Sequence, residues 1–84
     1  MKNEITVFSM AGCEPCKMLK QTLKRQCIEH KIVNIDEDPK QAMDRNIRGV
    51  PTTIITKGGE EHQRIVGCGV DVLELIQEAL NDGS

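Results

Sequence analysis

The chain contains 84 residues, a length that suits one domain over residues 1–84 and leaves no room for a second hydrophobic core. A net charge of −2, with acidic and basic residues interspersed and Phe8 as the single aromatic side chain, provides neither a basic patch nor a stacking surface, which argues against nucleic acid as a ligand. No segment approaches the roughly 20 apolar residues of a membrane span and the first residues lack a signal-peptide pattern, so we expect a soluble cytoplasmic protein that acts as a monomer.

A strand, a helix and a second strand are predicted in the first half of the chain. Residues 4–8 alternate in polarity and are rich in β-forming side chains, and residues 31–35 form a second short apolar strand. Between them, apolar residues recur at helical spacing from residue 14 to about residue 26, and Pro15 suits the first helical turn, where a backbone N–H is not needed. Connections of this length predict parallel strands joined by a right-handed crossover.

A hairpin is predicted in the second half. Residues 52–56 are all β-branched, and Gly58-Gly59 predicts a two-residue turn into an antiparallel strand over residues 60–66. Charged side chains along the second of these strands suit the edge of a sheet, where they discourage pairing with another chain.

Two further helices are predicted from capping patterns. Asp38, with Gln41 three residues later, indicates a helix to about residue 46, and Asp71, with Glu74, indicates another to about residue 80. A buried stripe is expected on the last helix from Val72, Leu75, Ile76 and Ala79. The predicted order is β-α-β-α-β-β-α, an α/β fold with a four-stranded mixed sheet flanked by three helices.

The candidate chemistry lies in the C-x-x-C pair of Cys13 and Cys16. Two thiols at this spacing on a first helical turn are close enough to form a disulfide, and Pro15 stiffens the ring between them. Cys13 faces the unpaired N–H groups and the positive end of the helix dipole, which favour its thiolate, so Cys13 is the expected nucleophile and the more buried Cys16 the resolving thiol. Lys17 adds a positive charge nearby, and Glu14 a negative charge that is expected to offset part of the effect of the dipole on Cys13.

The alternative for a C-x-x-C pair is half of a zinc site. The two missing ligands would have to come from Cys27, Cys68, His30 and His62, none of which forms a second C-x-x-C or H-x-x-x-H pair. We therefore favour a redox dithiol with no bound cofactor or metal, and keep a zinc or iron–sulfur protein as the alternative.

Four segments resemble the thioredoxin-like superfamily: GCEPCK at residues 12–17, NID at residues 34–36, IRGVPT at residues 47–52, and RIVG at residues 64–67. The part from Asn34 onward is most similar to thioredoxin, whereas the length is similar to glutaredoxins and to small redoxins that feed ribonucleotide reductase. The resemblance implies a thioredoxin-like fold and an oxidoreductase that reduces protein disulfides. It implies electrons from NADPH through a thioredoxin-reductase-type flavoenzyme, or from glutathione, and suggests ribonucleotide reductase as a client.

The resemblance also implies a cis peptide bond between Val50 and Pro51 beside the dithiol, with the Val50 backbone pairing with a substrate peptide. A plain proline at the start of a strand is the alternative. In the predicted sheet, the last strand ends on the same rim as Pro51, which makes Gly67 and Cys68 candidate substrate contacts. Cys68 is then a third thiol near the dithiol, or a passive residue packed under the groove.

Some residues depart from the family pattern or have simpler interpretations. The tryptophan before the nucleophile is Gly12 here, and the buried aspartate of thioredoxins corresponds to Val7, so a proton relay through that carboxylate is not expected. Cys27 is expected to be a half-buried passive thiol, and Met18 and Met43 to fill the aliphatic core.

Overall fold

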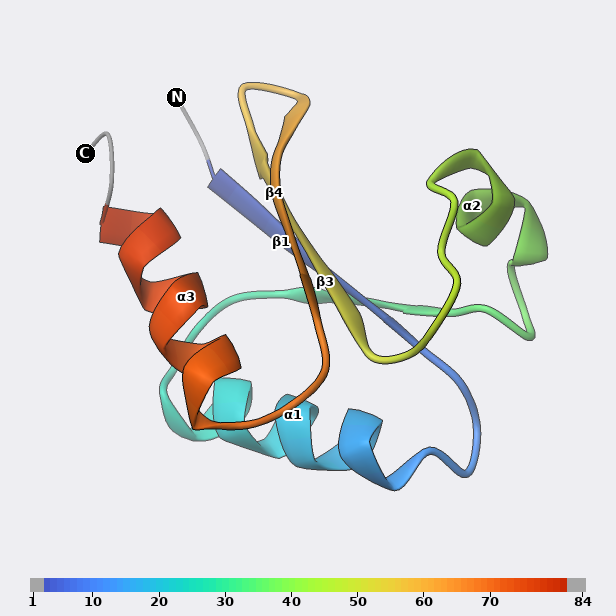
Figure 1. Ribbon diagram of the computed structural model, residues 1–84, viewed down its shortest axis with the longest axis horizontal. Coiled ribbons are helices and arrows are strands. Elements are labelled where there is room, and N and C mark those ends of the chain that lie inside the picture. Colours follow the sequence, from blue (N-terminus) through green and yellow to red (C-terminus); the bar gives the residue numbers. More distant parts are fainter. Residues whose placement is uncertain (1–2, 82–84) are drawn as a thin grey trace.

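The computed structural model describes residues 3–81 and shows a sheet accompanied by helices (Figure 1). The elements are β1 (Asn3–Ser9), α1 (Glu14–Arg25), β2 (Lys31–Asn34), α2 (Pro39–Asp44), β3 (Thr52–Lys57), β4 (Glu60–Val66) and α3 (Val70–Asn81). This is the β-α-β-α-β-β-α order that the sequence predicts, and the strands deviate from the predicted bounds by one residue at most.

The four strands lie in the order β2-β1-β3-β4. β1 is parallel to β2, while β3 is antiparallel to both β1 and β4, as expected for a mixed sheet. Phe8 pairs with Thr52 and Thr52 pairs with Val66, so the end of β1, the start of β3 and the end of β4 share one rim. The Gly67 N–H donates to the Pro51 carbonyl at 2.9 Å, which closes the rim between β3 and β4.

The hydrophobic core lies between the sheet and the two longer helices, α1 and α3, which lie together and away from α2 (Figure 1). The predicted stripe of α1, Cys16, Leu19 and Leu23, is buried as expected. The core cluster consists of Ile5, Val7, Leu19, Leu23, Ile55, Ile65, Val72, Ile76 and Ala79. β3 is buried on both of its faces from Thr52 to Thr56, which explains why its sequence is almost continuously β-branched.

Several expectations about side chains and helix ends are wrong. α3 begins at Val70, so Asp71 lies inside its first turn and is not the residue that caps it. Leu75 is 40% exposed because the helix packs through Val72, Ile76 and Ala79, and Leu75 projects from the neighbouring row. Met18 and Met43 are exposed as well, since neither belongs to the buried stripe of its helix.

Left-handed residues end the first two helices. Cys27 has a φ of 56°, its N–H donates to the Lys24 carbonyl, and the Ile28 N–H donates to the Leu23 carbonyl at 3.0 Å. This is the Schellman arrangement, in which glycine usually occupies the left-handed position. Asn46, with a φ of 54°, ends α2 in the same way, and this helix is therefore two residues shorter than predicted. The turn also leaves Cys27 exposed, not half-buried as expected.

Replacing Cys27 with glycine is expected to stabilise the protein. Glycine removes the steric cost of a Cβ atom in the left-handed region, and this outweighs its larger loss of backbone entropy, for a gain of roughly 0.5–1 kcal/mol. Urea unfolding under reducing conditions measures the change. Cys27→Ala, which keeps the Cβ atom, is the matched control and should lie near the wild type; an equal gain in both variants would contradict the backbone explanation.

The hydroxyl groups of two neighbouring threonines on β3 differ in their hydrogen bonding. Thr52 Oγ1 donates to the Gly49 carbonyl at 2.6 Å, whereas the buried Thr53 Oγ1 has no hydrogen-bond partner among the described residues. A buried polar group without a partner loses its hydration and gains nothing in return.

The two threonines therefore predict opposite effects of the same substitution. Thr53→Val keeps the side-chain shape and removes the unpaired hydroxyl, so the free energy of unfolding should rise by about 1 kcal/mol. Thr52→Val removes the hydrogen bond to the Gly49 carbonyl and should lower the free energy of unfolding by about the same amount. Thermal or urea unfolding of both variants tests this pair, and a loss of stability in Thr53→Val would show that its hydroxyl is satisfied.

Candidate active site

Cys13 sits at the junction between β1 and α1. The chain leaves β1 through a turn in which Gly12 has a φ of 76°, and Cys13 then takes the N-cap position of α1 with an extended backbone. Its Sγ accepts a hydrogen bond from the Cys16 N–H at 3.3 Å. The sulfur therefore occupies the place of a helix-capping oxygen, at the positive end of the helix dipole.

The two thiols differ in exposure. Cys13 is partly exposed and Cys16 has no exposed surface, and both are free thiols. Burial raises the pKa of the Cys16 thiol above its ordinary value of 9.0, and hydrogen bonding with Cys13 raises this pKa further, against smaller lowering effects from the Met10 backbone and Lys20. Cys16 therefore keeps its proton at neutral pH, beneath a sulfur that a substrate can reach.

The charged neighbours of the pair interact with each other. Lys17 Nζ lies 3.7 Å from Glu14 Oε1 on the exposed first turn of α1, and Pro15 stands between the two cysteines, as predicted. Because both charged side chains are largely solvated, water and the opposite charge screen the field of each at the dithiol. Glu14, Pro15 and Lys17 are thus exposed neighbours of the two cysteines and do not bury them.

The loop before β3 lies on the same rim of the sheet as the end of β1. The Val50–Pro51 peptide bond is cis, in agreement with the resemblance, and Pro51 is buried while Val50 is half-buried. Two hydrogen bonds hold this loop: Thr52 Oγ1 to the Gly49 carbonyl, and the Gly67 N–H to the Pro51 carbonyl. The threonine bond was not predicted, although a hydroxyl directly after the proline is a sequence signal that could have suggested it.

Gly67 and Cys68 follow β4 on the same rim. Gly67 and Gly69 have positive φ angles, which favour glycine on both sides of the thiol. Cys68 is half-buried, packs against the core cluster, and lines a shallow groove of about 330 Å³ together with Val66 and Leu75. Packing of this kind fits the passive alternative, while the groove keeps part of the residue accessible.

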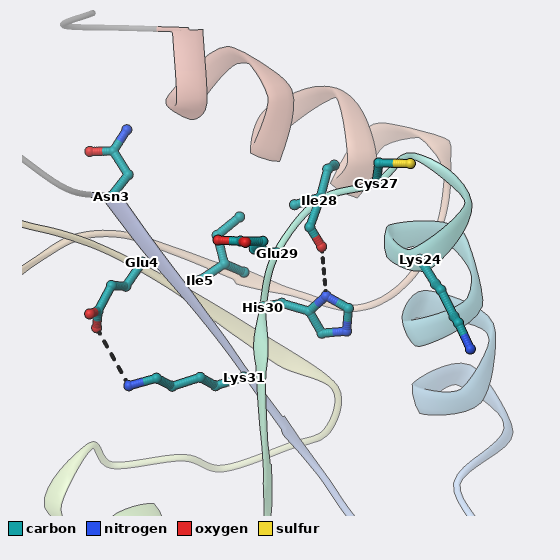
Figure 2. A pocket seen from close by; sticks show the side chains of 9 residues that line it. All are labelled: Asn3, Glu4, Ile5, Lys24, Cys27, Ile28, Glu29, His30 and Lys31. Atoms are coloured by element: carbon teal, nitrogen blue, oxygen red, sulfur yellow. Dashed lines mark hydrogen bonds and ion pairs between the residues drawn. The ribbon is translucent and has the colours of Figure 1, made fainter.

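A separate hollow of about 550 Å³ lies at the other ends of β1 and α1. It is lined by Asn3, Glu4, Ile5, Lys24, Cys27, Ile28, Glu29, His30 and Lys31. In Figure 2, Glu4 reaches Lys31 and the His30 ring turns to the Ile28 carbonyl, to which Nδ1–H donates at 2.8 Å. The hollow is thus built from the start of β1 and the end of α1, whereas the dithiol lies at their opposite ends.

Residues 3–81, the part of the chain that the structure describes, contain neither a candidate metal centre nor a candidate membrane-spanning helix. No three His, Cys, Asp or Glu side chains there gather in an arrangement that could hold a metal ion. None of the helices in this range is long and apolar enough to cross a membrane.

A C-x-x-C pair at the start of a helix, on a β-α-β-α-β-β-α fold with a cis-proline loop on the adjoining rim, defines a thioredoxin-like dithiol protein. Comparisons agree with this class. The glutaredoxin family model matches residues 5–58. A thioredoxin-like protein derived from the SPbeta prophage of Bacillus subtilis is 37% identical over 69 residues, covering 80% of this chain and 86% of that protein.

Plant and animal thioredoxins are similar as well. Thioredoxin H2-1 of rice, Oryza sativa subsp. japonica, is 33% identical over 92% of this chain, which spans only 59% of the rice protein. The solved structure of Schistosoma mansoni thioredoxin has a TM-score of 0.82 and 26% identity, covering 93% of this chain and 78% of that one. The chain belongs to the thioredoxin-like superfamily, in the thioredoxin and glutaredoxin family of disulfide oxidoreductases.

The raised pKa of Cys16 predicts how stability depends on pH. The folded state holds the Cys16 proton to a higher pH than the unfolded chain does. The contribution of this thiol to the free energy of unfolding is therefore complete below about pH 9 and is lost as the pH rises through the pKa of the folded state. The reduced wild type should lose up to about 1.4 kcal/mol per pH unit there beyond any loss in Cys16→Ala. Urea unfolding between pH 7 and about pH 10.5 measures both slopes. Cys27→Ala, which removes an exposed thiol, should follow the wild type, and parallel curves for the wild type and Cys16→Ala would contradict the assignment.

Proposed function

We propose that this protein reduces disulfide bonds in other proteins by thiol–disulfide exchange, with Cys13 as the nucleophile and Cys16 as the resolving thiol. One observation carries the proposal: the partly exposed Cys13 sulfur caps α1 and accepts the Cys16 N–H, while the Cys16 thiol is buried directly below. The hydrogen bond and the dipole stabilise a thiolate at Cys13, which is the form that attacks a disulfide.

The exchange proceeds in two steps. The Cys13 thiolate attacks one sulfur of the substrate disulfide, forms a mixed disulfide and releases the other sulfur as a thiolate, which takes up a proton. Cys16 then gives its proton to water and attacks Cys13 Sγ. The second substrate sulfur leaves as a thiolate and takes up a proton, so the substrate is released as a dithiol and Cys13–Cys16 becomes the disulfide. The capped Cys13 thiolate needs no base in the first step, whereas the second step has to deprotonate Cys16 without the buried carboxylate of thioredoxins, since Val7 occupies that position.

The substrate peptide is proposed to lie along the rim beside the dithiol. Val50 would offer its backbone N–H and C=O to an added strand, with Pro51 beneath it, and Gly67 and Cys68 would contact the other side of the peptide. The two hydrogen bonds that hold the Val50–Pro51 loop support this role, because a fixed loop loses little entropy when a peptide pairs with it.

Reduction must restore the dithiol after each cycle. We propose that electrons come from NADPH through a thioredoxin-reductase-type flavoenzyme, with glutathione as the second candidate, in the reducing cytoplasm. The thioredoxin relatives support the first source and the glutaredoxin model match supports the second. Ribonucleotide reductase is the proposed client, on the basis of the small-redoxin resemblance alone.

Serine variants of the two cysteines test the assigned roles. Cys13→Ser should abolish turnover because the attacking thiolate is gone, and Cys16→Ser should accumulate a covalent mixed disulfide on Cys13 because nothing resolves it. Insulin reduction measures the activity, and intact and peptide mass spectrometry locates the adduct. Recovery of the adduct on Cys16 in the Cys13→Ser variant would reverse the roles of the two thiols.

The same insulin assay distinguishes the reductants. One reaction contains thioredoxin reductase and NADPH, and the other contains glutathione, glutathione reductase and NADPH. We expect the first to be faster, since Glu14-Pro15 is unlike the Pro-Tyr of glutaredoxins. Faster turnover with glutathione would assign the protein to the glutaredoxin mode of recycling.

A further inference from the structure

A groove of about 640 Å³ begins directly beside the Val50–Pro51 loop. It is lined by Asn46, Arg48, Gly49, Thr52, Arg64 and Val66. Gly49 and Thr52 flank the Val50–Pro51 bond in the chain, and Thr52 pairs with Val66 across the sheet. The groove therefore runs from the proposed peptide-binding loop to the outer strand of the sheet, β4.

Arginine side chains dominate the charge of this groove. Arg64 Nε and Nη2 donate to Glu61 at 3.2 and 3.0 Å, and Arg45 Nη1 lies 3.7 Å from the same carboxylate. Arg48 is exposed, and no ion pair or hydrogen bond of its side chain is recorded within residues 3–81. The lining holds two arginines and no acidic residue, while Arg45 and Glu61 next to it add one charge of each sign, so these four side chains carry an excess of two positive charges in a chain whose net charge is −2.

The wall of the groove is held in place. Arg64 Nη1 donates to the Asn46 carbonyl at 3.3 Å, in addition to its two bonds with Glu61. The guanidinium thus links β4 to the residue that ends α2, only a few residues before Val50. Arg48 lies in the chain between Asn46 and Val50. Its planar guanidinium, which has no ion-pair or hydrogen-bond partner within residues 3–81, has the geometry that matches a carboxylate.

We propose that this arginine groove binds acidic side chains next to the substrate disulfide, so that the protein prefers disulfides flanked by Asp or Glu. The inference rests on the proposed function, because it needs a peptide paired with Val50. Such a peptide is extended, advances about 3.3 Å per residue and points alternate side chains to opposite sides. A carboxylate one or two residues from the half-cystine therefore reaches Arg48 while the disulfide stays at Cys13.

The hollow in Figure 2 has no comparable excess of positive charge. Its lining includes two lysines, Lys24 and Lys31, and two glutamates, Glu4 and Glu29, and one pair of opposite charges already meets at 3.8 Å between Lys31 and Glu4. Because these charges balance, the hollow favours neither acidic nor basic ligands. The preference for acidic groups is therefore assigned to the arginine groove.

Three disulfide peptides of identical length test the proposal. They carry Glu, Gln or Lys at the two positions that flank one half-cystine, and the full-length protein reduces each under steady-state conditions. At low ionic strength kcat/KM should be about 5-fold higher for the Glu peptide than for the Gln peptide and lowest for the Lys peptide, and the ratio should fall below about 2 in 0.5 M NaCl.

Variants then locate the preference. Arg48→Ser should bring the Glu to Gln ratio to about 1, and Arg48→Glu should reverse it in favour of the Lys peptide. Arg25→Ser, at the exposed end of α1 away from the groove, is the matched control and should keep the wild-type ratio. Circular dichroism checks that each variant is folded.

The outcomes separate this inference from the proposed function. Equal kcat/KM for the three peptides with the wild type, or an acidic preference that persists in Arg48→Glu, would overturn the arginine groove and leave disulfide reduction intact. No reduction of any peptide by the folded, reduced protein would overturn the proposed function itself.

Discussion

β1 and β3 pair in an antiparallel register over six residues, from Asn3 opposite Lys57 to Phe8 opposite Thr52, in the middle of the sheet. This register brings the chain that follows β1 and the chain that precedes β3 to one rim, although about 40 residues separate Ser9 from Pro51 in the sequence. The dithiol, the cis-proline loop and the end of β4 lie on this rim as a consequence. A shift of one residue would also turn Val7 out of the core, so burial and site geometry reinforce each other.

The start of α1 uses one side chain for two purposes. Helices need a group to accept their first N–H donors, and serine, threonine or aspartate usually provide it. Here the Cys13 sulfur does so, and the interaction that completes the helix also fixes the position of the thiol that is proposed to react. Cys16, on the buried stripe of the same helix, experiences the opposite environment. A single turn of helix therefore separates the thiol that is proposed to attack from the thiol that is proposed to resolve the mixed disulfide.

The sequence predicts elements better than it predicts their surroundings. Periodicity, turn residues and capping patterns together predicted every strand and helix, and the position of Cys13 and Cys16 at the start of a helix followed from local rules. The capping pattern failed at Asp71 because the helix starts one residue earlier, and Leu75 was misplaced because helical spacing alone does not say how wide the buried stripe is. The cis bond came only from the resemblance. The arginine groove could not be predicted from the sequence because it joins residues 46–49 to Arg64 and Val66, which come together only after β3 and β4 pair.

The placement of β3 also bears on how the chain avoids aggregation while it folds. Its run of β-branched residues has the strongest strand preference in the chain, and a segment of this kind adheres to copies of itself when it is exposed. Three of its five buried residues are threonines, whose hydroxyls make the unfolded segment less adhesive than a run of isoleucine or valine. Once folded, β3 is enclosed between β1 and β4, and β4 presents Glu60, Glu61, His62 and Arg64 at the edge. The strand most prone to self-association is thus kept inside the sheet, and β4, one of the two edge strands, carries charges that discourage pairing with other chains.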